Sequence, residues 1–113
     1  MSKREWKLFI EDILESIRLI KNYVENMGFD DFKNDRKTID AVVRNFEIIG
    51  EASRFIPDEI KEKYENADWK GIVGLRNRIA HKYFDISLSI VWHIVMKELP
   101  TLEDQMKEIL EQS

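Results

Sequence analysis

Apolar residues recur along the chain at intervals of three and four, which is the period of an α-helix. The strict two-residue alternation of a half-buried strand is absent. The first such series predicts a long helix that ends near Gly28, with the apolar positions Trp6, Ile10, Ile13, Ile17, Ile20, Val24 and Met27 on one face. A second helix is predicted from about residue 35 to residue 55, with charged residues opposite its apolar face. Pro57 ends it and favours the start of a short helix.

Two further helices are predicted in the second half. The third begins at Asp68, a suitable N-cap, and runs through "WKGIVGLRNRIA", although Gly71 and Gly74 weaken it. The last begins around residues 85–87 and keeps one apolar phase through Pro100, so it is either one helix kinked by the proline or two helices that share a face. It also carries a second apolar edge, which is either deeper core or a surface for a partner, at Ile86, Ile90 and Ile94.

Long helices joined by short connections predict an all-α fold, an antiparallel bundle of four to five helices. A chain of 113 residues fits a single domain that spans residues 1–113. The spare apolar edge leads us to expect a homodimer.

Composition narrows the class of protein. A hydrophobic fraction of 43% fits a soluble globular chain, and the lack of cysteine excludes disulfides, a thiol nucleophile and cysteine-ligated metals. No apolar run reaches the ~20 residues needed to span a bilayer. The N-terminal stretch "MSKREWKLFIEDILESI" lacks the uncharged core of a signal peptide. We therefore expect a cytoplasmic protein without a membrane partner.

Charge is unevenly distributed. The formal net charge is −4, yet residues 69–84 contain no acid and four basic residues, Lys70, Arg76, Arg78 and Lys82. Overall acidity argues against broad, non-specific nucleic-acid binding, but a local basic island suits contact with a phosphate. The alternative is a chance cluster on a solvated face.

The two histidines, His81 and His93, stand twelve residues apart, which is not a zinc-binding spacing. No glycine-rich phosphate loop is present either, and we expect neither a metal site nor a cofactor. His93 lies inside the last predicted helix and is expected to be a structural or surface residue. His81 differs because cations surround it.

A histidine and an arginine suffice to cleave RNA without a metal: the histidine transfers protons and the arginine stabilises the phosphate. On an ideal helix Arg76 lies about 140° from His81, whereas Asn77 and Arg78 share its face. Either Arg78 is the partner of His81, or the helix ends early and the chain turns His81 back toward Arg76. In a third arrangement, contacts between two subunits bring the histidine and an arginine together. The non-catalytic alternative is a helix end whose cations complement the helix dipole.

The segment "RNRIAH" has the R-x4-H form seen in HEPN domains, and "RNRIAHKY" extends it to R-x4-H-x-Y. This longer pattern resembles the HepT-like toxins of bacterial and archaeal toxin–antitoxin pairs. "DAVVRNFEIIGEASRFIP" and "VWHIVMKELPTL" are similar to that family's second and closing helices, so the resemblance covers nearly the whole chain.

The resemblance implies a HEPN-like, homodimeric helical bundle with metal-independent endoribonuclease activity. Arg76 and His81 occupy the catalytic positions of the family motif, and polar Asn77 follows the arginine. Arg78 and Lys82 are additional cations that we expect to support RNA binding.

The resemblance also implies a protein partner, a nucleotidyltransferase antitoxin (MntA-like) that neutralises the toxin by adding AMP to the motif tyrosine, here Tyr83. The alternative to an enzyme is a non-catalytic HEPN-like module that binds a nucleotide, RNA or a protein. Replacing His81 separates the two, because a pure binder has no cleavage to lose.

Overall fold

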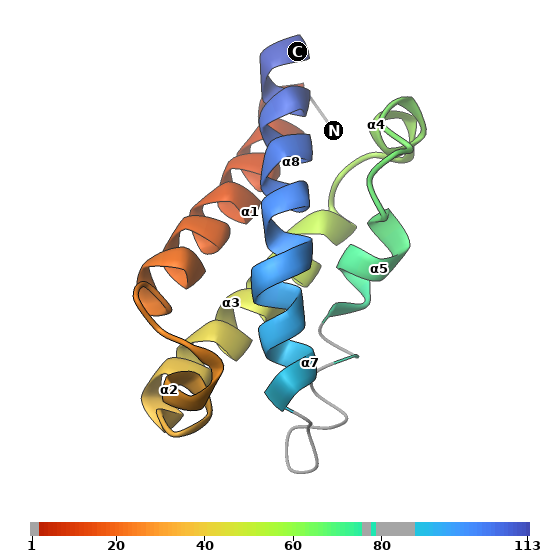
Figure 1. Cartoon of the computed structure of the whole chain (residues 1–113). Helices are drawn as coiled ribbons and strands as arrows, with labels where there is room; N and C mark the ends of the chain where they lie inside the picture. Colours follow the sequence, from red (N-terminus) through yellow and green to blue (C-terminus); the bar gives the residue numbers. More distant parts are fainter. Residues whose placement is uncertain (1–2, 76–77, 79–87) are drawn as a thin grey trace.

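The computed structural model describes residues 3–75, 78 and 88–113 (Figure 1). Across these ranges the chain is helical and contains no strand, which confirms the predicted all-α fold. The helices are α1 (Lys3–Tyr23), α2 (Phe29–Lys33), α3 (Arg36–Arg54), α4 (Asp58–Lys63), α5 (Trp69–Val73), α7 (Leu88–His93), the π-helical segment η1 (Ile94–Glu98) and α8 (Leu99–Gln112).

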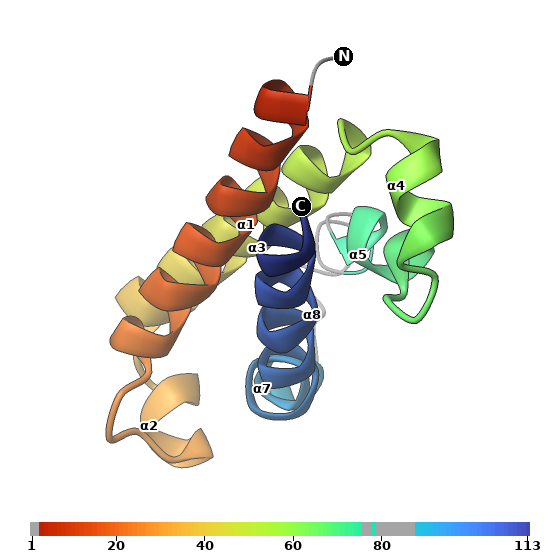
Figure 2. The same ribbon diagram turned by 90° about the horizontal axis from the view of Figure 1, so that it is seen from above.

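The core lies between α1, α3 and α8. Helix α1 packs against both of the others and runs antiparallel to them (Figures 1 and 2). The side chains that fill this seam with essentially no exposed surface include Ile10, Ile13, Ile17, Ile20, Phe46, Ile49, Met106 and Ile109. Helices α4 and α5 form the return from α3 toward the last helix. None of the helices within the described ranges is both long and apolar enough to cross a membrane.

Helix α3 begins and ends within one residue of the prediction. The Asp35 side chain accepts a hydrogen bond from the Thr38 backbone N–H at 3.1 Å and another from the Thr38 hydroxyl at 2.8 Å. These two bonds, the hydroxyl first, lower the pKa of Asp35 below its ordinary value. Phe55 caps the other end through its backbone N–H.

The first predicted boundary was wrong by several residues. Helix α1 ends at Tyr23, and the chain then turns through Asn26, whose φ of 63° lies in the left-handed region. Asparagine is among the few residues that tolerate this conformation. Gly28 does not stop α1 but stands as the N-cap of α2, where its backbone N–H donates to Asp31.

The predicted third helix was also wrong in its extent. Asp68 is the expected N-cap and accepts from the Gly71 N–H at 3.1 Å, but α5 ends after Val73 with Gly74 as its C-cap. Beyond this end, the Arg78 N–H donates to the Gly74 carbonyl at 2.9 Å. Glycine holds a helix weakly because it loses much backbone freedom on folding, and this explains the break.

The last helical stretch is continuous from Leu88 to Gln112 and contains a π-helical segment just before Pro100. The Leu99 N–H donates to the Ile94 carbonyl, five residues back. Proline supplies no N–H and its ring crowds the preceding turn, so the widened turn accommodates it within one helix.

The second apolar edge of this helix was predicted to be either deeper core or a surface for a partner, and its two described residues support one alternative each. Ile94 is buried, as deeper core requires, whereas Ile90 is 45% exposed. Ile86 lies outside the described residues, as does the predicted helix start at residues 85–87.

Candidate functional site

Most of the predicted site lies outside the described residues: Arg76, Asn77, His81, Lys82 and Tyr83. The roles assigned to them remain predictions. Leu75 and Arg78 are described, and they flank the first two of these residues in the chain. The surroundings of Leu75 and Arg78 are therefore the described surroundings that lie nearest in the chain to Arg76 and Asn77.

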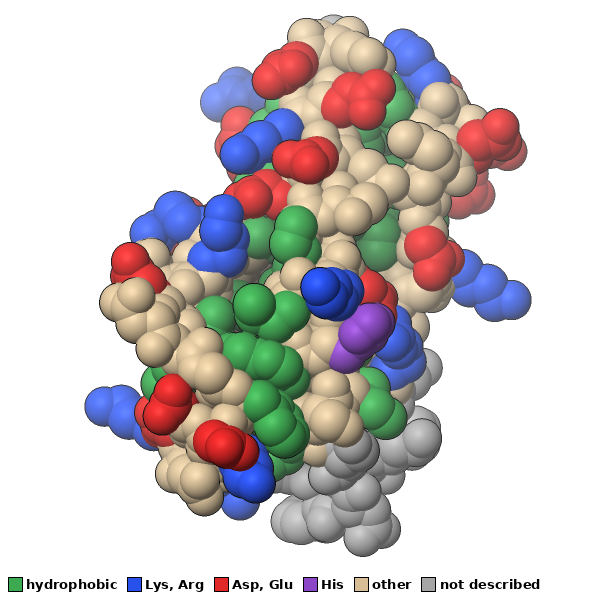
Figure 3. Space-filling view, in the orientation of Figure 1, with side chains coloured by type: hydrophobic (Ala, Val, Ile, Leu, Met, Phe, Trp, Pro, Cys, Tyr) green, Lys and Arg blue, Asp and Glu red, His purple; other side chains and the backbone are tan. Residues whose placement is uncertain are grey.

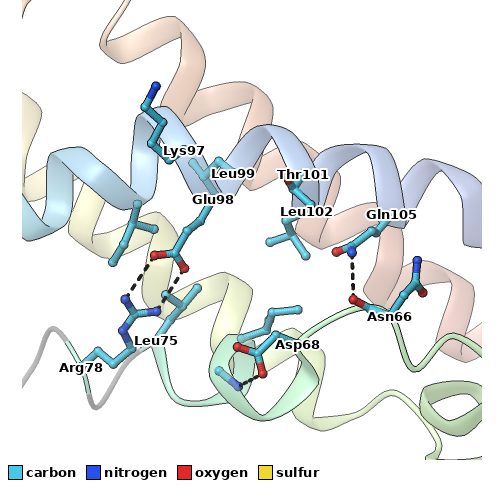
Figure 4. A pocket seen from close by; sticks show the side chains of 13 residues that line it. Asn66, Asp68, Leu75, Arg78, Lys97, Glu98, Leu99, Thr101, Leu102 and Gln105 are labelled. Atoms are coloured by element: carbon cyan, nitrogen blue, oxygen red, sulfur yellow. Dashed lines mark hydrogen bonds and ion pairs between the residues drawn. The ribbon is translucent and has the colours of Figure 1, made fainter.

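Arg78 forms a two-point ion pair with Glu98 of η1 (Figure 4). Its Nη1 lies 3.2 Å from Oε1 of Glu98, and its Nη2 lies 3.3 Å from Oε2. Such parallel contacts fix the orientation of the guanidinium as well as its position. The pair connects Arg78 to the last helical stretch, across 20 positions of sequence.

Helix α5 precedes Arg78 in the chain and is held by contacts of its own. Trp69 is buried, and its indole N–H donates to the Tyr64 carbonyl at 3.1 Å. Ile72 and Leu75 are buried beyond it. Gly71 leaves room for the capping carboxylate of Asp68, because a Cβ added at Gly71 would collide with that side chain.

Between α5 and the last helix lies a hollow of about 270 Å³ (Figure 4). Its floor is apolar and comprises Ile72, Leu75, Ile94, Leu99 and Leu102. Its edge is polar and includes Asn66, Lys97, Thr101 and Gln105, together with the Arg78–Glu98 pair. The hollow thus borders the signature segment and combines an apolar surface with hydrogen-bonding groups.

His93 is exposed on α7, as expected of a surface histidine. In the parts of the chain that the structure describes, no group of three or more histidine, aspartate or glutamate side chains is arranged to hold a metal ion.

Comparison with protein families gives a match over most of the chain. The model described as Ribonuclease HepT-like covers residues 13–109, which include the signature segment. The chain belongs to the HepT-like ribonuclease family. The resemblance inferred from "RNRIAHKY" and the flanking segments is confirmed.

Three curated relatives of this HepT-like chain match over nearly their full lengths. "Putative RNase MJ1380" of Methanocaldococcus jannaschii is 41% identical over 107 residues, which cover 95% of this chain and 98% of the relative. "Putative RNase TTE0752" of Caldanaerobacter subterraneus is 40% identical and covers 91% and 92%. "Probable ribonuclease HepT" of Thermococcus cleftensis is 36% identical and covers 95% and 97%. No solved structure gives a significant match.

No pattern in the sequence indicated the role of Glu98. It lies 20 positions after Arg78 in a helix with many other acids, so no local spacing marks it as a partner. The hollow was missed for the same reason, since Asn66, Thr101 and Gln105 come together only through packing.

The pair between Arg78 and Glu98 predicts a measurable coupling. We expect a double-mutant cycle of Arg78→Ala and Glu98→Ala to give about 0.5–1 kcal/mol, the upper part of the range for partly exposed pairs, because the contact is two-point. Urea denaturation of the four proteins measures it. Additive effects of the two substitutions would contradict the pairing.

Proposed function

We propose that this HepT-like chain is a metal-independent endoribonuclease toxin of a toxin–antitoxin pair. The observation that carries the proposal is the family match, because the matched residues 13–109 contain the R-x4-H-x-Y signature. The names of the curated relatives support a ribonuclease.

The proposed chemistry uses the 2′-hydroxyl of RNA as the nucleophile. His81 accepts the proton of this hydroxyl, the 2′-oxygen attacks the adjacent phosphorus, and the bond to the 5′-oxygen breaks. The leaving oxygen takes up a proton. Arg76 binds the phosphate and stabilises the charge that grows in the transition state, with Asn77 and Lys82 in support.

The ion pair of Arg78 favours Arg76 as the main phosphate ligand. Both nitrogens at the tip of the Arg78 guanidinium already face the Glu98 carboxylate. A phosphate would have to displace that carboxylate or share the guanidinium with it. In this assignment, Arg78 binds Glu98 and Arg76 binds the phosphate.

We further propose that the chain acts as a homodimer that brings two signature segments together. On the face seen in Figure 3, hydrophobic side chains gather between charged ones. Ile90 and Met96 of the last helix are 45% and 48% exposed, and such surface is typical of contact with a second protein. A dimer that brings two basic segments together would also help an otherwise acidic protein to bind a polyanionic substrate.

Regulation is proposed to act at Tyr83. A nucleotidyltransferase antitoxin transfers AMP from ATP to the phenolic oxygen, and pyrophosphate leaves. The added phosphate then competes with RNA phosphate for the cations of the signature segment. Cleavage stops without any unfolding.

The catalytic assignment predicts that His81→Ala and Arg76→Ala each lower RNA cleavage by about 10²-fold or more. Circular dichroism should show unchanged helical content. His93→Ala is the matched control, because this exposed histidine lies outside the signature and should cleave normally. Arg78→Ala should retain more activity than Arg76→Ala.

The same assay in EDTA tests the mechanism, and cleavage should persist. Loss of cleavage in EDTA with recovery on adding magnesium would contradict a metal-free reaction. An inactive Arg78→Ala beside an active Arg76→Ala would reverse the assignment of the two arginines. Wild-type protein that binds RNA without cutting it would favour the non-catalytic module.

The regulatory assignment predicts that the cognate antitoxin with ATP raises the mass of the wild-type chain by AMP units and silences it. Tyr83→Phe should remain a ribonuclease and escape silencing, because it lacks the acceptor oxygen. Tyr23→Phe, at the exposed end of α1, is the matched control and should still be modified. Mass spectrometry and the cleavage assay report both effects. Equal modification of Tyr83→Phe would rule out Tyr83 as the switch.

A further inference from the structure

The hollow between α5 and the last helix has no role in the chemistry described above. It borders Arg78, and Leu75 forms part of its floor (Figure 4). Arg76 and Asn77 stand between these two lining residues in the chain. A strand of RNA held at the signature segment would therefore have a neighbouring nucleotide close to this hollow.

The charges around the hollow do not suit a phosphate. Arg78 faces Glu98, and Asp68 accepts from the N–H of Gly71. Lys97 is the remaining charged residue of the lining, and within the described part of the chain it makes no ion pair. Two cations and two anions sum to zero, so the hollow favours a neutral group.

The hydrogen-bonding edge suits a planar heterocycle. The Gln105 side-chain N–H donates to the backbone carbonyl of Asn66 at 3.1 Å. Among the described residues, no donor is bonded to the Gln105 side-chain oxygen, which can act as an acceptor. The Asn66 amide and the Thr101 hydroxyl add both donors and acceptors to this edge. Amide and hydroxyl groups of this kind read the edges of unstacked RNA bases.

The volume of the hollow also favours a single heterocyclic base. The volume of about 270 Å³ lies just below the range in which pockets for complete drug-sized ligands begin, roughly 300 Å³. It suits one nucleobase better than a whole nucleotide. The apolar floor, which includes Ile72, Leu75 and Leu102, offers a surface that the face of a base can cover.

We propose that this hollow binds the nucleobase of a nucleotide next to the cut in single-stranded RNA. The inference rests on the proposed ribonuclease function and extends it to sequence preference. The signature segment contacts the phosphate, which carries no sequence information, and the hollow reads a neighbouring base.

The test compares wild type with Thr101→Trp, which fills the hollow from an exposed position of α8, and with Gln105→Ala, which removes part of its polar edge. Gln112→Trp places the same bulk on the same helix outside the hollow and is the matched control. Circular dichroism and light scattering check the fold and the mass of each protein. The substrate is a pool of short single-stranded oligoribonucleotides, and the cut sites are sequenced.

Thr101→Trp should raise KM about tenfold, the scale of one lost base contact, with kcat close to wild type. It should also lose the base preference beside the cut. Gln105→Ala should change which base is preferred, and Gln112→Trp should match wild type. A second measurement uses a 2′-O-methyl oligonucleotide, which cannot be cleaved, and follows the Asn66 and Gln105 side-chain amides by NMR. Their signals should shift on binding in wild type and stay fixed in Thr101→Trp.

Unchanged KM and base preference in both hollow variants would overturn the inference, while wild-type cleavage would leave the proposed function standing. A change of oligomeric mass in Thr101→Trp would also overturn it, because the hollow would then belong to an interface between subunits. Wild-type protein that cuts no RNA but shows the amide shifts would refute the ribonuclease and retain the base site. If wild-type protein shows neither RNA cleavage nor the amide shifts, the proposed ribonuclease function and the proposed base site are both refuted.

Discussion

Ile13 and Ile17 of α1, Phe46 of α3 and Met106 of α8 are buried in one apolar seam, and the position of every other element depends on it. Burial of each such side chain contributes on the order of 1.5–3 kcal/mol, more than any exposed ion pair in this chain. Through this seam, α3 and α8 both pack against α1. The chain that returns from α3 through α4 and α5 then lies beside the last helical stretch (Figure 1). Lys70 of α5 and Arg78, two of the four basic residues of the stretch 69–84, belong to the described part of the chain.

Two kinds of contact hold the return in place. Trp69, Ile72 and Leu75 bury apolar surface, and Arg78 forms its two-point pair with Glu98. Burial of apolar surface supplies most of the stability. The ion pair fixes how Arg78 is oriented, because its two-point geometry admits one orientation of the guanidinium. Glu98 closes the π-helical segment before Pro100, so an irregular turn of the last helix presents the carboxylate. Irregular turns of this type are frequent at functional sites.

Local sequence signals were sufficient where local contacts decide the structure. The second helix was predicted within a residue from its apolar spacing and from Pro57, and the structure adds a cap at Asp35. Asp68 was predicted as an N-cap and is one. The break at Gly74 was not predicted, because Gly71 and Gly74 weaken a helix without fixing where it ends. The partnership of Arg78 and Glu98 depends on packing between segments 20 positions apart, which no local pattern encodes. The signature motif together with the flanking segments, by contrast, indicated the family.

Analysis of the product ends tests the central claim most directly. If the 2′-hydroxyl is the nucleophile and protein side chains transfer the protons, each cut must leave a 2′,3′-cyclic phosphate, or its hydrolysed monophosphate, on one fragment and a 5′-hydroxyl on the other. Mass spectrometry of a cleaved oligoribonucleotide distinguishes these ends. A substrate with a single 2′-deoxy or 2′-O-methyl residue at the cut should resist cleavage. Products with a 5′-phosphate and a 3′-hydroxyl, or efficient cutting of the 2′-deoxy substrate, would contradict the account.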